Sequence, residues 1–130
     1  MKTFKKGILA LGLTLGIIAS VGGAAFAGSN AYGQVNGYAA SGRSRISKYT
    51  AEAETNFANK GTVTVYSEYI YVNVSKLNAG KITKNDGGNN TDKASLSFTA
   101  PSNTRSVKIN SSHVVYALGN LWNASTKATY

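Results

Sequence analysis

The stretch TVTVYSEYIYVNV at residues 62–74 decides the fold class, because β-branched and aromatic residues fill most of it. The apolar alternation of Val63 and Val65 changes phase before Ile70, which predicts a β-bulge near residues 67–68. Beyond that point both faces are apolar, as is typical of a central strand. We therefore expect residues 62–74 to form a strand inside an antiparallel sheet.

Two further stretches alternate with the period of a strand. Residues 93–100 direct four apolar side chains to one face: Ala94, Leu96, Phe98 and Ala100. Residues 45–57 also alternate, and one side of this stretch carries Tyr49, Ala51, Ala53, Thr55 and Phe57. No stretch after residue 28 keeps a helical period, so we expect strands throughout.

Turn residues separate these predicted strands. The sequence NKG at 59–61 predicts a hairpin with Gly61 in the left-handed conformation, and Gly119-Asn120 predicts a second hairpin. PSN at 101–103 breaks the chain again. Residues 75–92 are predicted to be a long loop whose mobile part is NDGGNN at 85–90. Residues 28–38 are either a first strand or an unstructured leader.

Six or seven short strands without a helix predict an all-β fold, a small antiparallel β-sandwich or partly open barrel. A chain of 130 residues allows one domain, which we place at residues 28–130. Its expected core consists of apolar side chains from the predicted strands: Val63, Val65, Ile70, Val72, Leu96, Phe98, Val107, Ile109, Val115, Leu118 and Trp122.

The first 27 residues have the pattern of a secretory signal peptide. Three Lys residues stand within the first six positions, an apolar run follows at residues 8–21, and the small-x-small sequence AFA closes it at 25–27. The 14 apolar positions would span about 21 Å as a helix, short of the roughly 30 Å core of a membrane. We therefore expect cleavage after Ala27 and a secreted, extracellular product.

The composition excludes several kinds of site. The chain has no Cys and one His, so it offers no thiol nucleophile and no site built from two His. His113 follows two Ser residues, yet a structural or hydrogen-bonded surface His is its expected role. Glu52 and Glu54 share a strand face, which we interpret as solvated with cross-strand Lys–Glu pairs. We expect no enzymatic activity, no metal and no cofactor.

Charge and aromatic content remain as functional signals. After residue 27 the chain keeps 11 basic and 5 acidic residues, a net charge of +6. Six of the basic residues form two clusters in the sequence, namely Arg43, Arg45 and Lys48, and then Lys76, Lys81 and Lys84. The candidate aromatic contacts are Tyr69, Tyr71 and Trp122. Outside a cell such a protein meets anionic cell wall or membrane rather than nucleic acid.

The C-terminal end of the chain resembles a family of secreted bacterial proteins. Ser112-His113 and the ending from Trp122-Asn123-Ala124-Ser125 to Tyr130 are similar to the lactococcin 972 family. The resemblance implies a secreted β-sandwich bacteriocin of Gram-positive bacteria that acts on septum and cell-wall synthesis. It transfers no individual functional residue.

We therefore hypothesise a secreted, non-enzymatic, cationic protein that binds the anionic bacterial envelope as a bacteriocin-like antagonist. The two basic clusters would capture the surface, and the aromatic candidates would then make specific contacts. An extracellular glycan- or protein-binding module is an alternative, indicated by the Tyr content. A second alternative is an exported inhibitor of a protease or autolysin, with residues 75–92 as the bait loop. The oligomeric state stays open, because sheet edges can pair between chains.

Overall fold

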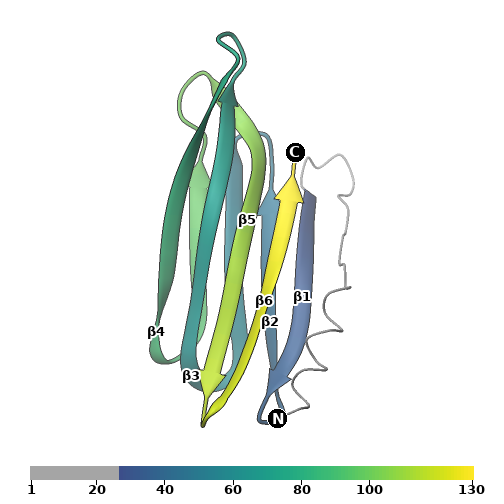
Figure 1. Ribbon diagram of the computed structural model, residues 1–130, viewed down its shortest axis with the longest axis vertical. Coiled ribbons are helices and arrows are strands. Elements are labelled where there is room, and N and C mark those ends of the chain that lie inside the picture. The colour runs from purple at the N-terminus through teal and green to yellow at the C-terminus, as the bar shows by residue number, and fades with distance from the viewer. Residues whose placement is uncertain (1–26) are drawn as a thin grey trace.

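The computed structural model describes residues 27–130, which form six antiparallel strands and no helix (Figure 1). The strands are β1 (Ala27–Val35), β2 (Tyr38–Ile46), β3 (Thr50–Asn73), β4 (Asn78–Thr99), β5 (Thr104–Ala117) and β6 (Asn120–Thr129). The all-β, antiparallel prediction is confirmed. The predicted signal peptide lies outside the described residues, apart from Ala27, which begins β1.

Strand β3 is the centre of the sheet, as its sequence predicts. The strand order is β1-β2-β3-β5-β6, and β4 pairs with the other edge of β3. The first part of β3, residues 51–57, pairs with β2, and its second part, residues 62–73, pairs with β5. Because β4 follows β3 along nearly its whole length, both parts of β3 have a neighbour on each side.

The β3–β4 ribbon folds back on itself near residues 57–61 (Figure 1). Nine residues of straight strand would cover about 30 Å, yet Thr55 Oγ1 donates to the Thr64 carbonyl at 3.0 Å. On β4, Lys84 Nζ likewise donates to the Ser97 carbonyl at 2.7 Å, across 13 residues. The two parts of each strand therefore lie in opposite layers. The predicted hairpin at 59–61 is wrong, because the strand continues through an irregularity in register.

Gly61 is required by a close approach and not by a left-handed turn, since its φ is not positive. A Cβ at this position would lie 2.7 Å from the Tyr116 carbonyl oxygen and 3.0 Å from Ala117 Cβ. The absence of a side chain at Gly61 thus lets the bend of β3 pack against the end of β5.

Strands β1 and β6 lie side by side and nearly close the sheet into a barrel (Figure 1). The backbone N–H of Lys127 donates to Ser29 Oγ at 2.9 Å across this seam. Across the interior, Gly42 of β2 lies against the His113 ring of β5, where a Cβ would be 2.3 Å from His113 Cγ. The fold is therefore one antiparallel sheet wrapped around a thin interior, in place of two separate sheets.

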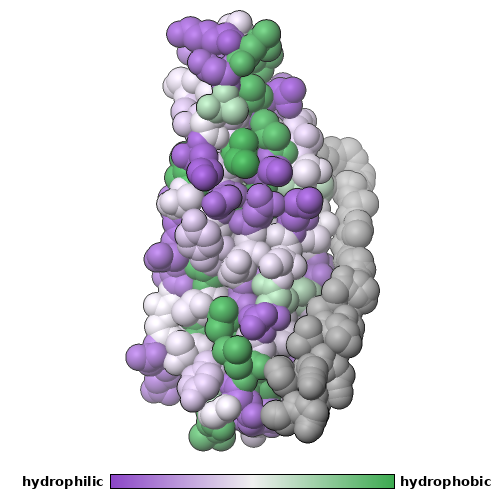
Figure 2. Space-filling view, in the orientation of Figure 1, coloured by the Kyte–Doolittle hydropathy of each residue, from purple (hydrophilic) through white to green (hydrophobic). Residues whose placement is uncertain are grey.

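The apolar core agrees with the prediction at six positions, where the side chains are fully or almost fully buried: Val63, Val65, Phe98, Ile109, Val115 and Trp122. Four others are only partly buried: Ile70, Val72, Leu96 and Val107. The prediction for Leu118 is wrong, because this side chain is 86% exposed at the β5–β6 turn. The outer surface in Figure 2 is mostly hydrophilic or intermediate, with hydrophobic residues at the upper tip and the lower end.

The predicted phase change in β3 is misplaced. The odd-numbered residues from Val63 to Tyr69 continue one alternation, and all of them are buried. Ser67 belongs to this inward set. Because Ser67 is polar, it interrupts the apolar alternation in the sequence, although the alternation of the strand itself continues. The irregularity in the pairing with β5 lies between Ile70 and Tyr71.

The predicted loop at residues 75–92 is a strand for most of its length. Residues 78–91 pair with β3, and this backbone ladder outweighs the low strand propensity of Asn, Asp and Gly. Only residues 74–77 form a turn, in which Asn73 Oδ1 accepts from the backbone N–H groups of Ser75 and Lys76. The bait loop of the inhibitor hypothesis is therefore reduced to this short turn.

The remaining turns follow their sequence signals more closely. Leu118-Gly119, with positive φ at both residues, joins β5 to β6 one residue before the predicted position. Asn36-Gly37 joins β1 to β2 in the same way, so residues 27–35 are a strand and not a leader. Asn-Gly is a strong hairpin signal that the sequence interpretation overlooked. The break predicted at 101–103 is the β4–β5 connection.

Candidate functional site

A polar layer crosses the interior of the barrel. Its side chains form a continuous hydrogen-bonded chain of buried residues, with neighbouring atoms 2.6–2.8 Å apart, in the order Ser67, Ser111, Ser44, Thr126, His113 and Thr55. A hydroxyl group can both donate and accept, so these residues satisfy one another without solvent.

His113 is a structural member of this layer. Its Nδ1 lies 2.7 Å from Thr55 Oγ1 and its Nε2 lies 2.8 Å from Thr126 Oγ1. Burial lowers the pKa of the imidazole from 6.5 to about 4, so the ring is neutral at pH 7. The predicted structural role agrees with these contacts, whereas the predicted surface position is wrong, because the side chain is fully buried.

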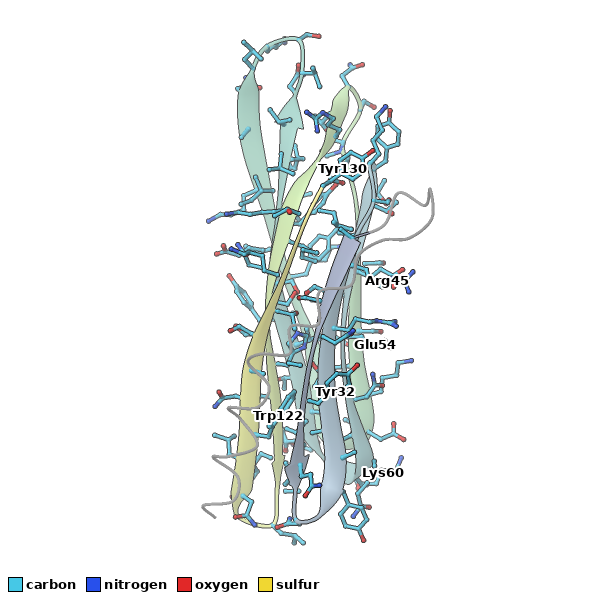
Figure 3. All side chains as sticks on the ribbon, turned by 90° about the vertical axis from the view of Figure 1, so that its right-hand side faces the viewer. Tyr32, Arg45, Glu54, Lys60, Trp122 and Tyr130 are labelled. Atoms are coloured by element: carbon cyan, nitrogen blue, oxygen red, sulfur yellow. The ribbon has the colours of Figure 1, made fainter. Side chains whose placement is uncertain are left out.

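Two of the three predicted aromatic contacts are fully buried. Trp122 points into the barrel (Figure 3). Tyr69 stacks on Phe98 with ring centroids 5.1 Å apart, and its hydroxyl lies 2.8 Å from Ser106 Oγ. Tyr71 is partly buried, with its ring centroid 6.2 Å from that of Tyr69. Trp122 and Tyr69 therefore pack the interior and do not reach a surface partner in this structure.

Two residues of the first predicted basic cluster, Arg43 and Arg45, lie beside carboxylates, whereas Lys48 does not. Arg43 Nη2 donates to Glu54 Oε1 at 2.7 Å, and Lys93 Nζ lies 3.1 Å from Glu54 Oε2. Burial acts to raise the pKa of Glu54, but the Lys93 hydrogen bond and the Arg43 charge outweigh it and lower that pKa from 4.5. Arg45 stands opposite Glu52 in the β2–β3 register. The predicted cross-strand Lys–Glu pairing is confirmed at Glu54 by Lys93, although the Glu54 side chain is only 17% exposed.

The second predicted basic cluster is divided among three surroundings. Lys81 Nζ lies 3.7 Å from a carboxylate oxygen of Glu68. Lys84 donates to the backbone of the same strand, as described above. Lys76 lies on the exposed β3–β4 turn. Only Lys76 of these three is placed to attract an anionic partner without first leaving another contact.

Lys84 instead protects the free edge of β4. Its ammonium group lies 5.0 Å from the Phe98 ring centroid while it donates to the Ser97 carbonyl. Two residues along, Asp86 Oδ2 accepts from the backbone N–H of Ser95 at 3.0 Å. Charged side chains from one half of β4 thus cap backbone groups of the other half, which opposes pairing with another chain at this edge.

Four basic residues stand on or near the strand connections at one end of the barrel, which we name the cationic pole: Lys48, Lys76, Arg105 and Lys108. The segments that carry them are joined, because Ser106 N–H donates to the Lys48 carbonyl at 2.7 Å and Asn73 pairs with Thr104. Within residues 27–130 none of the four forms an ion pair. The acidic residues of this part of the chain are at positions 52, 54, 68, 86 and 92, and the ion pairs that Glu54, Glu68 and Asp92 form are with cations other than these four.

Exposed apolar and aromatic side chains accompany these cations. Leu77 is 81% exposed on the β3–β4 turn, with a φ of 54° that Leu rarely adopts. Val74 is exposed on the same turn, Tyr49 is exposed on the β2–β3 connection, and Tyr130 is exposed after β6 (Figure 3). The cationic pole therefore combines unpaired positive charge with apolar surface.

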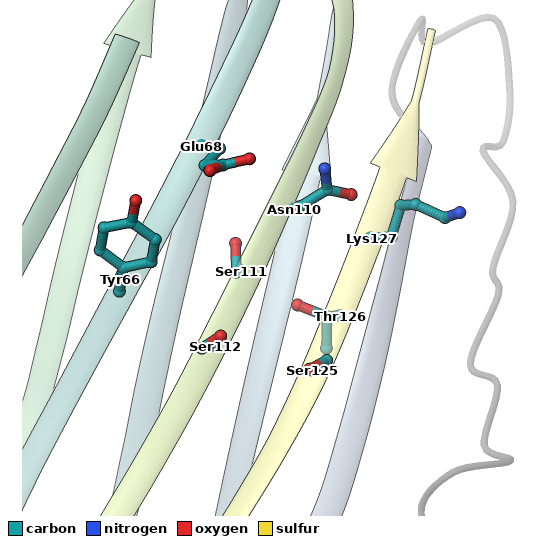
Figure 4. A pocket seen from close by; sticks show the side chains of 8 residues that line it. All are labelled: Tyr66, Glu68, Asn110, Ser111, Ser112, Ser125, Thr126 and Lys127. Atoms are coloured by element: carbon teal, nitrogen blue, oxygen red, sulfur yellow. The ribbon is translucent and has the colours of Figure 1, made fainter. Parts of the chain in front are cut away.

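A shallow polar hollow lies on the outer face of β3, β5 and β6 (Figure 4). One row of its lining runs across the three strands through Tyr66, Ser112 and Ser125, and the next row through Glu68, Asn110 and Lys127. Ser111 and Thr126 line it from below, since they belong to the inward face. The sequence interpretation missed this site, because it took Tyr69 and Tyr71 as surface candidates in place of Tyr66.

The described residues, 27–130, contain no group of three or more His, Cys, Asp or Glu side chains that could hold a metal ion. In the same part of the chain no helix is long and apolar enough to cross a membrane. Comparisons with protein-family models, curated proteins and solved structures find no match to this chain.

Proposed function

We propose that this protein is secreted and binds the anionic surface of a bacterial envelope through the cationic pole, as a bacteriocin-like antagonist. The separation of charge supports the proposal most directly. Arg43, Lys81 and Lys93 face carboxylates, whereas Lys48 and Lys76 of the pole have none within residues 27–130. Each Lys or Arg near an anionic membrane contributes about 1 kcal/mol of attraction, which salt weakens.

The chemistry of the partner follows from the pole. Phosphodiester groups of teichoic acid or of lipid headgroups carry the negative charge that unpaired Lys and Arg attract. Leu77 and Val74 project from the same end and would enter the contact after electrostatic capture. They take over the role that the sequence hypothesis assigned to Tyr69 and Trp122.

Two triple variants with equal loss of charge test this proposal. The pole variant carries Lys48→Gln, Lys76→Gln and Arg105→Gln. The paired variant carries Lys60→Gln, Lys81→Gln and Lys93→Gln, and each of these Lys side chains faces a carboxylate. Binding is measured at low and high salt to phosphatidylglycerol vesicles, to Gram-positive cell walls and to walls stripped of teichoic acid. Comparison of these three surfaces identifies the source of the phosphate.

The pole variant should bind about a hundredfold more weakly, because three attractions of about 1 kcal/mol each are removed. The paired variant should lose less than about threefold. Growth of Gram-positive indicator cells is followed in parallel, and arrest by the wild type but not by the pole variant is expected of an antagonist. Equal weakening by both variants would mean that net charge alone acts, and the proposal would be wrong.

A further inference from the structure

We propose that the hollow around Tyr66 binds a saccharide, at a second site independent of the cationic pole. Tyr66 lines two neighbouring hollows on the outer face of the barrel. One extends over β5 and β6 to Ser125 and Lys127. The other extends over β4 to Asn85 and Gly87. The ring therefore stands between two depressions and offers contact surface on both sides.

Short neighbours keep this ring accessible. Tyr66 pairs with Ser112 on β5 and with Asn85 on β4, and its side chain remains 44% exposed. Gly87, two residues further along β4 than Asn85, has a φ of 149°, a conformation that residues with a side chain rarely adopt. A Cβ there would also lie 2.5 Å from the Val63 carbonyl oxygen. The backbone conformation thus requires glycine at position 87, and the missing side chain leaves the second hollow open.

Hydrogen-bonding groups surround the ring on the β5–β6 side. Ser112 and Ser125 supply hydroxyl groups, and Asn110 supplies an amide that can both donate and accept. Glu68 and Lys127 stand at the far row of the hollow (Figure 4). The site therefore offers donors and acceptors of both neutral and charged types around one aromatic platform.

This combination fits a sugar better than other ligands. A pyranose ring has a C–H face that packs on an aromatic ring and hydroxyl groups at its edge that need several hydrogen-bond partners. The Glu68 carboxylate in the lining disfavours a polyanion, and the Lys81 ammonium group is engaged with this carboxylate at 3.7 Å. An extended peptide would need a free strand edge, whereas this hollow lies on the face of paired strands.

The experiment is an NMR titration of the purified, isotope-labelled protein with soluble oligosaccharides. The probes are β-1,4-linked tetrasaccharides of N-acetylglucosamine, glucose and mannose. Tyr66→Ala removes the platform. Tyr116→Ala is the matched control, because Tyr116 is 47% exposed on the outer face of β5 but does not line the hollow. The pole variant separates this site from the envelope-binding proposal.

At least one tetrasaccharide should shift the amide signals of Ser112 and Ser125 at millimolar concentration. Tyr66→Ala should weaken binding about tenfold or more, while Tyr116→Ala and the pole variant leave it unchanged. Ser112→Gln, which fills the hollow and keeps the ring, should also block binding. The proposal is overturned if no probe shifts these signals, if Tyr116→Ala weakens binding as much as Tyr66→Ala, or if Ser112→Gln binds like the wild type.

Discussion

Inside the barrel seven polar side chains are at most 5% exposed, whereas the cations of the pole lie on its surface. Ser44, His113 and Thr126 hydrogen-bond to one another across the interior. Lys48 and Lys76 have no carboxylate partner in the described part of the chain. The hydrogen-bonding groups of the interior side chains find their partners within the fold, whereas the charges of Lys48 and Lys76 are available to a partner molecule.

This difference separates residues that stabilise the fold from residues that are free to bind. A buried hydrogen bond contributes about 1 kcal/mol net, but leaving a buried polar group without a partner costs about 1–3 kcal/mol. An exposed, unpaired cation carries no comparable penalty when it is removed. Changes in the interior layer should therefore act on stability, and changes at the pole should act on binding.

The largest effect on stability is expected from Gly42→Ala. The new methyl group would lie 2.3 Å from His113 Cγ and 2.5 Å from Cδ2, so the imidazole must leave its two hydrogen bonds. We expect a loss of about 3 kcal/mol in the free energy of unfolding, at the upper end of overpacking costs. Chemical denaturation followed by tryptophan fluorescence measures it, since Trp122 is buried.

Gly88→Ala is the control for this substitution, because a Cβ at Gly88 would meet nothing within 4 Å. Its free energy of unfolding should stay within about 0.5 kcal/mol of the wild type. If Gly42→Ala were as stable as Gly88→Ala, the tight contact between β2 and His113 would be refuted.

Lowering the pH should reduce the free energy of unfolding by a similar amount, through the interior layer. The pKa of His113 is about 4 in the folded protein and 6.5 in the absence of burial. Between these values the unfolded chain binds a proton that the fold excludes, so stability is complete above pH 6.5 and is lost as the pH falls. The loss approaches about 3 kcal/mol near pH 4, since one pKa unit corresponds to about 1.4 kcal/mol.

The measurement is the free energy of unfolding at a series of pH values, for the wild type and for His113→Gln. The difference between them isolates the imidazole. Glu54 has a pKa lowered from 4.5, so its own contribution is lost only at lower pH. A wild-type slope between pH 6.5 and 5 equal to that of His113→Gln would contradict the burial of a neutral ring.

The fold class was predictable where the inward face is apolar or small. Ala51 and Ala53 stand two positions apart on β3 and are buried, and Phe98 is buried in the alternating stretch of β4. The prediction failed on β4, because Lys84 and Asp86 share the inward face there. Their partners are backbone groups thirteen and nine residues further along the chain, which become neighbours only when the ribbon folds back.

The candidate sites depended on register, which alternation in a single sequence does not determine. A shift by one residue exchanges the two faces of a strand. Reading Ser67 as a change of phase put Tyr69 outside, whereas the uninterrupted alternation from Val63 puts Tyr69 inside and Tyr66 outside. The ion pairs that neutralise Arg43 and Lys81 likewise follow from strand pairing. The exposure of Lys76 could be predicted from the sequence, since this residue lies on a turn whichever register is chosen.

The smallest effect on stability should come from the pole variant. Removing Lys48, Lys76 and Arg105 breaks no ion pair of residues 27–130 and relieves repulsion between like charges. Its free energy of unfolding should therefore stay within about 0.5 kcal/mol of the wild type. The paired variant, which removes three exposed Lys side chains from ion pairs, should lose up to about 1 kcal/mol at low salt and less at high salt.

Urea denaturation of both variants at two salt concentrations measures this difference. A pole variant that is less stable than the paired variant would show that the pole cations support the fold. Its loss of envelope binding would then have a structural cause, and the separation between interior and pole would fail. If the order is as expected, the variant that changes stability least is the one that changes binding most, because the pole cations take part in no ion pair of residues 27–130.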